Sequence, residues 1–263
     1  MSKVSHKRMV QKYYSKRAFD YDKQKARTWK SRTGFDAQIF NEITKAALNA
    51  EKGTGLEIGI GSGRVCFYLI KETEHCFAGI DLSKEMLKLA KGKLTSYRKK
   101  SNLLLADAEY IPFQDNTFNL VICMSTLHYL ASPKCALKEI SRVLKKNGVF
   151  IYGDVCMHEE DVTSFMDRLE RTISPAHAKY YKPSEMRRLI EKNGICVAKT
   201  KIISYRKSYA SLIEDKARYF NIKSEKLFHL ITESTEKEKE LYKIDENQMT
   251  LFYMIMIGFK VTA

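Results

Sequence analysis

A run of glycines followed by spaced carboxylates is the part of this chain most able to do chemistry. The segment Gly55-Leu56-Glu57-Ile58-Gly59-Ile60-Gly61-Ser62-Gly63-Arg64 joins a short apolar strand to a turn with glycine at every second position. Such glycines let the backbone turn sharply and approach a ligand, because no Cβ is in the way. From Arg64 the apolar residues recur at helical spacing, so the segment predicts the first half of a nucleotide-binding βαβ unit. A glycine-rich connector without a ligand is the alternative.

A second acidic residue stands where a ribose-binding carboxylate is expected. Asp81 ends the apolar run 76–80 and lies 24 residues after Glu57 (81 minus 57), close to the ~20 typical of nucleotide-binding folds. A carboxylate there accepts hydrogen bonds from both hydroxyls of an unphosphorylated ribose. The spacing G-x-G-x-G differs from the G-x-G-x-x-G of dinucleotide-binding proteins. An NAD-dependent oxidoreductase is therefore a rival prediction and not the favoured one.

These motifs resemble those of a known enzyme family. E-I-G-I-G-S-G followed by G-I-D-L-S is similar to the first motif and the next strand end of class I S-adenosylmethionine-dependent methyltransferases. The stretch 106–118 closely resembles the adenine-binding loop of the type-11 branch, which includes ubiquinone- and menaquinone-methyltransferase-like proteins. Tyrosines and basic residues within 9–22 resemble the N-terminal segment of that branch, which folds over the cofactor. The resemblance extends to the fifth predicted strand and covers residues 10–154.

The resemblance implies a cofactor, S-adenosylmethionine, and the residues that bind it. In such a site the Asp107 side chain accepts from the adenine amino group, the Ala108 N–H meets a ring nitrogen, and the backbone near Met124 holds the methionine part. The cofactor-binding residues so implied are Glu57, Gly59, Gly61, Gly63, Asp81, Leu82, Asp107, Ala108, Met124 and Tyr21. The product would be S-adenosylhomocysteine.

Several residues beyond the cofactor motifs are candidates for the acceptor side. Tyr14, Trp29 and Tyr129 are candidate acceptor-binding aromatics, although packing of an amphipathic helix is an equal alternative for the first two. His128 follows the fourth predicted strand and could be a general base, because histidine titrates near neutral pH. Packing or loop orientation is the commoner use of such a histidine. Asp154 lies at the carboxyl end of the fifth strand and faces the same site. No metal-ligand spacing is visible.

The rest of the pattern predicts the elements that must position these residues. Apolar runs predict parallel strands near 56–58, 76–80, 103–106, 118–123 and 149–152, with amphipathic helices between them, one of which covers 133–146. Helices are expected near 161–172 and 184–193, and strands near 195–204 and 251–261. The family resemblance implies a Rossmann-like, doubly wound, mostly parallel seven-stranded sheet with an antiparallel last strand and a helical cover.

Four parts follow from this organisation. An N-terminal helical lid covers 1–50, the cofactor-binding α/β domain 51–204, a helical insertion 205–249, and the last strand 250–263. The insertion is longer than an ordinary hairpin connection, and its apolar spacing predicts two helices. With the N-terminal segment it is predicted to form the acceptor pocket; dimerisation is the alternative.

Composition bounds the remaining functions. The net charge is +15, of which residues 1–33 contribute +9 from 11 Lys/Arg and 2 Asp, a distribution that favours an anionic partner or a solvated basic helix. Six cysteines without a C-x-x-C pair predict reduced, mostly buried thiols. We find no secretory signal and no apolar run near the ~20 residues of a membrane helix, so a cytoplasmic protein is expected.

The favoured function is methyl transfer from S-adenosylmethionine to a small-molecule acceptor by in-line displacement. Such chemistry needs the reacting groups held in line with water removed, and needs no catalytic triad or metal. The alternatives are a methyltransferase that acts on RNA or protein, a nucleic-acid-binding protein with a non-catalytic cofactor site, and the NAD-dependent oxidoreductase.

Overall fold

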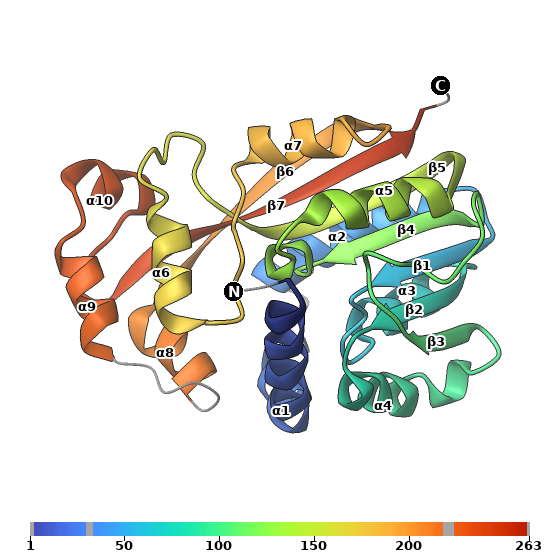
Figure 1. The fold of residues 1–263 in the computed structure, drawn as a ribbon, viewed down its shortest axis with the longest axis horizontal. Coiled ribbons are helices and arrows are strands. Elements are labelled where there is room, and N and C mark those ends of the chain that lie inside the picture. Colours follow the sequence, from blue (N-terminus) through green and yellow to red (C-terminus); the bar gives the residue numbers. More distant parts are fainter. Residues whose placement is uncertain (1–2, 30–33, 218–223, 262–263) are drawn as a thin grey trace.

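The computed structural model describes residues 3–29, 34–217 and 224–261. One seven-stranded sheet runs through it in the order β3-β2-β1-β4-β5-β7-β6 (Figure 1). Its strands are β1 (Thr54–Ile58), β2 (Cys76–Asp81), β3 (Ser101–Leu105), β4 (Phe118–Met124), β5 (Leu144–Cys156), β6 (Ile195–Ser208) and β7 (Gln248–Lys260). The first five strands pair in parallel, whereas β7 is antiparallel to both β5 and β6. The predicted doubly wound sheet with an antiparallel end is confirmed.

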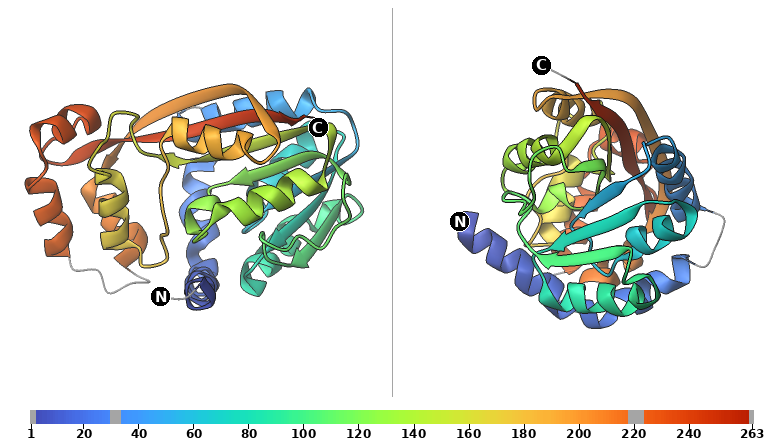
Figure 2. Two further views of the ribbon diagram at one scale, coloured as in Figure 1. Left: turned by 45° about the horizontal axis from the view of Figure 1, so that its top comes forward. Right: turned by 90° about the vertical axis from the view of Figure 1, so that its right-hand side faces the viewer.

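Helices cover both faces of the sheet, because the buried strands are apolar on both sides. The helices are α1 (Lys3–Trp29), α2 (Phe35–Leu48), α3 (Arg64–Glu72), α4 (Lys84–Lys93), α5 (Pro133–Val143), α6 (Phe165–Ile173), α7 (Pro183–Glu191), α8 (Tyr209–Ala217), α9 (Ser224–Thr232) and α10 (Glu236–Tyr242). Along β4, Val121 and Cys123 pack with α5 and α7, whereas Leu120 and Ile122 pack with α2 and α3. Figure 2 shows the resulting layers.

The long β6–β7 hairpin extends beyond the sheet into a smaller helical lobe (Figure 1). Apolar residues of α6, α8, α9 and α10 pack there around the start of β7, and Leu169, Leu227, Tyr242 and Met249 are fully buried. The insertion after β6 therefore contains three helices in its described residues, where the sequence pattern predicts two. These helices form a core of their own against α6.

Two other expectations were wrong in detail. The helix predicted over 133–146 ends at Val143, and β5 begins at Leu144, because Leu144 pairs with Phe118 of β4 and this pairing outweighs local helical spacing. All six cysteines are free, as expected, but Cys76, Cys135 and Cys196 are exposed.

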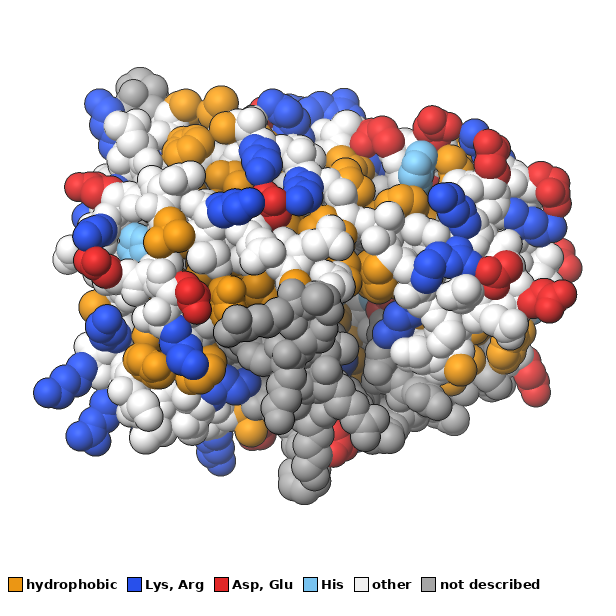
Figure 3. Space-filling view, turned by 180° about the vertical axis from the view of Figure 1, so that it is seen from behind, with side chains coloured by type: hydrophobic (Ala, Val, Ile, Leu, Met, Phe, Trp, Pro, Cys, Tyr) orange, Lys and Arg blue, Asp and Glu red, His pale blue; other side chains and the backbone are white. Residues whose placement is uncertain are grey.

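On the face of the molecule seen from behind, lysines and arginines are spread over the described surface with acidic side chains among them (Figure 3). Among the described residues, no helix is both long and apolar enough to cross a membrane.

Candidate functional site

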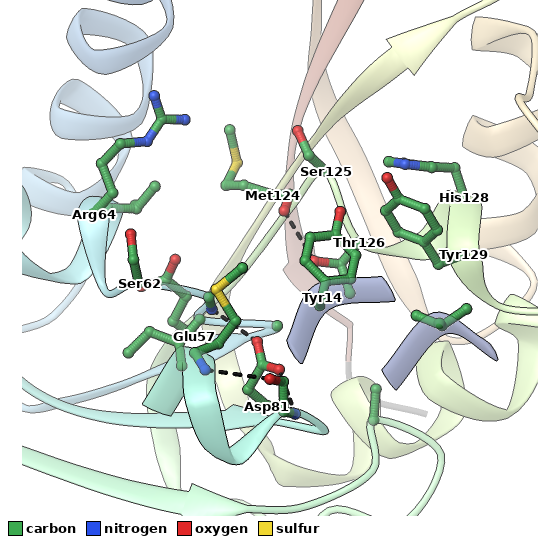
Figure 4. A pocket seen from close by; sticks show the side chains of 18 of the residues that line it. Tyr14, Glu57, Ser62, Arg64, Asp81, Met124, Ser125, Thr126, His128 and Tyr129 are labelled. Atoms are coloured by element: carbon green, nitrogen blue, oxygen red, sulfur yellow. Dashed lines mark hydrogen bonds between the residues drawn. The ribbon is translucent and has the colours of Figure 1, made fainter. Parts of the chain in front are cut away.

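The sheet changes winding direction between β1 and β4, and a cavity of about 290 Å³ lies there. Ligands of open α/β sheets bind at this point, beyond the carboxyl ends of the strands. The loops after β1, β2, β3 and β4 line one part of the cavity, and α1, α2 and α6 close it. Figure 4 shows Glu57 and Asp81 on one side of the cavity and His128 and Tyr129 on the other.

The glycine turn shapes the floor of the cavity. Gly61 has φ +54°, and a Cβ there would project into open space, with no neighbouring atom nearer than 4.0 Å. Gly59 also lines the cavity, and a Cβ on it would lie 2.3 Å from Thr126 Oγ1. Gly63 does not line the cavity; it begins α3 and packs against Ala90 of α4. The backbone is therefore open to a ligand at Gly61, whereas at Gly59 and Gly63 it packs closely against neighbouring side chains.

Asp81 fixes the glycine turn relative to the next helix. Its Oδ2 accepts from Gly61 N at 2.8 Å and its Oδ1 from Ser83 N at 2.8 Å. Burial raises the pKa of Asp81, although the N–H donors of Ser83, Gly61 and Leu82 act in the opposite direction. Each carboxylate oxygen can accept a second hydrogen bond, and Asp81 lines the cavity, so it can receive two hydroxyls from a ligand.

Glu57 holds the start of α3. Its Oε2 accepts from Cys66 N at 2.9 Å, and the residue is 3% exposed. Burial raises the pKa of Glu57 to about 8, against the opposing effects of the Cys66 N–H and Arg64. The side chain is therefore mostly protonated at neutral pH before any ligand binds.

The loop after β3 carries two carboxylates that contact the N-terminal helix. Asp107 Oδ1 accepts from Glu109 N at 3.0 Å, while Asp107 Oδ2 lies 2.6 Å from Lys7 Nζ. Asp107 and Ala108 both line the cavity. The sequence does not identify Lys7 as a site residue, because no local pattern distinguishes it from the other ten basic residues among the first 33.

His128 and Asp154 form a buried pair at the far side of the cavity. His128 Nδ1 lies 2.7 Å from Asp154 Oδ1, which also accepts from Val155 N at 2.9 Å. His128 lines the cavity, whereas Asp154 is 0% exposed and lies behind it. An Nδ1–H donated to the carboxylate leaves Nε2 as the basic nitrogen of the ring.

A segment from the helical lobe holds His128 from outside. The N–H groups of Ala178 and Lys179 donate to the His128 carbonyl at 2.9 and 3.2 Å. Asp167 of α6 fixes this segment, because its Oδ1 accepts from His177 Nε2 and from Tyr180 N. Burial by itself would raise the pKa of Asp167, but these donors together with Arg171 lower it to about 2. The lobe thus contributes to the position of His128.

Aromatic rings line the cavity, and those of Tyr129 and Tyr180 lie beside the His128 ring. The lining aromatic residues are Tyr14, Phe35, Phe40, Tyr129, Tyr180, Tyr205 and Tyr253. Burial raises the pKa of Tyr129, Tyr180 and Tyr253, so these phenols keep their protons at neutral pH. Tyr253 OH also lies 3.0 Å from Ser125 Oγ in the loop after β4. Local sequence patterns do not mark Tyr180 and Tyr253 as site residues, because they reach the cavity from distant segments.

The structure brings together most of the residues that the sequence predicts for the site. Those that line the cavity are Tyr14, Glu57, Gly59, Gly61, Asp81, Leu82, Asp107, Ala108, Met124, His128 and Tyr129. Tyr21 and Trp29 lie outside the residues whose side chains are described. Among the described residues of the predicted insertion 205–249, only Tyr205 lines the cavity, and the structure places Tyr205 in β6. The prediction that the helices of the insertion form its wall is therefore not met, because α8, α9 and α10 pack on α6 instead.

Residues 56–152 match the family model described as "Methyltransferase domain". Among curated proteins, MJ1123 of Methanocaldococcus jannaschii, named only as uncharacterized, is 30% identical over 54% of this chain and 61% of its own length. The uncharacterized methyltransferase YcgJ of Bacillus subtilis is 28% identical over 52% of this chain and 55% of its own. The human mitochondrial arginine-hydroxylase NDUFAF5 is 32% identical over 51% of this chain and 40% of its own. The chain thus spans about half the length of these relatives.

The crystal structure of YcgJ superimposes with a TM-score of 0.79 at 19% identity, over 86% of this chain and all of that one. The fold is therefore shared along most of the chain. Residues 56–152 thus resemble a methyltransferase domain, within a fold that most of the chain shares with YcgJ.

The cavity fits S-adenosylmethionine. Gly61 leaves an open backbone surface, Asp81 offers acceptors for two ribose hydroxyls, and Asp107 with the Ala108 N–H offers an acceptor and a donor for the edge of adenine. These groups follow β1, β2 and β3 in turn, so they lie along one edge of the sheet, where an extended nucleoside can reach all of them.

Proposed function

We propose that the protein transfers a methyl group from S-adenosylmethionine to a small molecule bound on the aromatic side of the cavity. The observation that carries this proposal is the position of Asp81: it fixes the glycine turn and still lines the cavity, at the switch point of a class I methyltransferase sheet. S-adenosylmethionine supplies a methyl carbon on a sulfonium, which is open to in-line displacement.

On the adenosine side, this chain's residues bind and orient. Asp81 would accept from the ribose hydroxyls and Asp107 from the adenine amino group, and Leu82 and Ala108 would line the adenosine part of the site. The glycine turn and Met124 lie toward the amino-acid part, where Ser62 and Arg64 also line the cavity. The carboxylates of Asp81 and Asp107 are fixed by backbone N–H groups before the ligand binds, so little order has to be created in them on binding.

On the acceptor side, His128 is the general base. It would take the proton of the acceptor's hydroxyl or amine at Nε2. Asp154 holds the Nδ1–H and stabilises the imidazolium that results. Because Asp154 is fully buried, its charge acts in a medium of low dielectric constant, where it stabilises the protonated ring more strongly than in water.

We infer a small-molecule acceptor because two helices border the cavity. Tyr14 and Arg17 of α1 and Glu170 of α6 line it, and the rings of Tyr14 and Tyr129 meet edge to face at 5.2 Å. Such a border would limit the access of water to the reacting atoms. Phenol hydroxyls of the lining keep their protons and can orient a polar group of the acceptor.

Calorimetric titration with S-adenosylhomocysteine tests the cofactor part. The wild-type protein should bind it, and Asp81→Ala should weaken binding at least about tenfold, since each hydrogen bond to a charged group contributes roughly 1.5–3 kcal/mol. Glu72→Ala, which removes an exposed carboxylate at the end of α3, should bind as the wild type does. Equal affinity in Asp81→Ala, or binding of NADH in place of S-adenosylhomocysteine, would contradict the proposal.

The mass of the product distinguishes methyl transfer from other chemistry on this fold. A fold hosts more than one reaction, and one relative is named an arginine-hydroxylase. Incubation of the protein with isotopically labelled S-adenosylmethionine and fractionated small molecules should yield a product that gains the labelled methyl. A product that gains oxygen instead would refute the transferase assignment.

A further inference from the structure

A lysine of the N-terminal helix bridges the two carboxylates of the adenine-side loop. Lys7 Nζ lies 2.6 Å from Asp107 Oδ2 and 2.7 Å from Glu109 Oε2. Lys7 and Asp107 line the same cavity. The three residues therefore join α1 to the loop that follows β3, at the place where the proposed function puts adenine.

The ion pair between Lys7 and Glu109 is partly buried, and its loss should therefore cost more than the loss of a surface ion pair. The side chain of Glu109 is 7% exposed, and within the described residues its buried Oε1 has no hydrogen-bond partner. Burial by itself would lower the pKa of Lys7, but hydrogen bonds to Asp107 and Glu109 raise it. The ammonium thus stays charged and compensates a carboxylate that water barely reaches. Removal of one partner of such a pair leaves an uncompensated buried charge.

Two more polar contacts continue the bridge along the helix. Gln11 Nε2 donates to Leu82 O at 2.9 Å, and Ser15 Oγ donates to Glu85 Oε2 at 2.6 Å. Lys7, Gln11 and Ser15 are spaced by four residues, so they lie on one face of α1. Each reaches a segment just beyond the carboxyl end of β2 or β3. These three polar residues bind α1 to the loops after β2 and β3, where the adenosine part of the cofactor is proposed to lie. Val10 and Tyr14 of the same helix line the cavity.

We propose that Lys7 is a positioning residue that couples adenine recognition to closure of helix α1. This inference rests on the proposed function. With Lys7 in place, the Asp107 carboxylate is held from two sides, by the ammonium and by the Glu109 N–H, and is oriented before adenine arrives. Bound cofactor leaves when the bridge breaks and α1 moves from the adenosine edge. Lys7 therefore sets the rate of cofactor release.

The test measures binding and protection, not turnover. Protein loaded with tritiated S-adenosylhomocysteine is chased with unlabelled ligand, and hydrogen exchange is followed in residues 3–18. Lys7→Met should release the ligand about tenfold faster and should speed exchange in this part of α1. Lys12→Met is the matched control, because Lys12 is an exposed lysine on the same helix; it should leave both quantities unchanged. Lys7→Arg should restore slow release in part.

A double variant separates the bridge from mere loop damage. In Lys7→Met/Glu109→Gln the uncompensated charge of Glu109 is gone, but α1 still lacks its contact with Asp107, so fast release should persist. Wild-type release from this double variant would show that Lys7 only neutralises Glu109, and would overturn the inference. Tighter binding by Lys7→Met would overturn it too, because Lys7 would then compete with adenine. Absence of any S-adenosylhomocysteine binding by the wild type would refute the proposed function as well, whereas the other outcomes concern Lys7 alone.

Discussion

The buried carboxyl group of Glu57 should make the stability of this protein depend on pH in a way that one substitution removes. Glu57 is 3% exposed at the end of β1, and burial raises its pKa from 4.5 to about 8. The unfolded chain leaves this carboxyl in water, with a pKa near 4.5. Between these two values the folded state binds more protons than the unfolded state, so the free energy of unfolding falls as pH rises. The contribution is full below pH 4.5 and lost by pH 8.

The magnitude follows from the two pKa values. Each pH unit between them is worth about 1.4 kcal/mol, so the loss from pH 5 to pH 8 is on the order of 4 kcal/mol. Glu57→Gln replaces the carboxyl by a neutral group of the same shape, whose oxygen can still accept from Cys66 N. The variant should therefore gain stability relative to the wild type as pH rises, by about 1.4 kcal/mol per unit.

Urea unfolding followed by circular dichroism at pH 5, 6, 7 and 8 measures this difference directly. Subtraction of the wild-type free energy from that of the variant cancels the other titrating groups, provided that both unfold in two states. Glu72→Gln, an exposed glutamate on α3, should show no trend. A constant difference between Glu57→Gln and the wild type would mean that Glu57 is ionised in the folded protein, held so by Arg64 and Lys93, and would refute the reasoning.

The remaining predictions concern the base, the glycine turn and the basic arm. His128→Asn and Asp154→Asn should each slow methyl transfer by about 100-fold or more while S-adenosylhomocysteine still binds; full activity in either would exclude the base. Gly61→Ala should weaken S-adenosylhomocysteine binding at a stability cost of roughly 1 kcal/mol, because its methyl group enters the cavity; Gly59→Ala should lose much more stability in thermal unfolding, through the clash with Thr126. Binding of RNA should be weak and should fall steeply between low and physiological salt in filter-binding assays; tight binding of one RNA at physiological salt would contradict the small-molecule acceptor.

Much of the adenosine side of the site could be predicted because its residues are fixed by their neighbours in the chain. Gly59 and Gly61 adopt positive φ within one turn. The Asp81 side chain accepts a hydrogen bond from the N–H of Ser83, which is only two residues further along the chain. The two glycines follow β1 and Asp81 ends β2, and the carboxyl ends of parallel strands meet at one edge of the sheet. Local spacing therefore specified both the conformation and the place of these groups.

The pattern failed where pairing between elements outweighed local preference. Residues 144–146 continue a helical spacing in the sequence, yet Leu144 belongs to β5 because β4 offers it a partner. The insertion after β6 looked free to cover the cavity, but its apolar residues bury one another against α6. An apolar stripe on a helix indicates that this face is buried, but it does not indicate which other element buries it.

What the sequence by itself determined was the order of strands and turns along the chain, and its motifs indicated the cofactor class through their resemblance to a known family. Only the tertiary structure decided which side chains face each other across that frame. Lys7 contacts Asp107 although the two are 100 residues apart in the sequence, and His128 contacts Asp154 across a separation of 26 residues. Lys7 looks like ten other basic residues of the arm until α1 is placed on the sheet. Local conformation depends on the nearest few residues, whereas these contacts depend on how separate elements pack, which is fixed by apolar burial over the whole molecule.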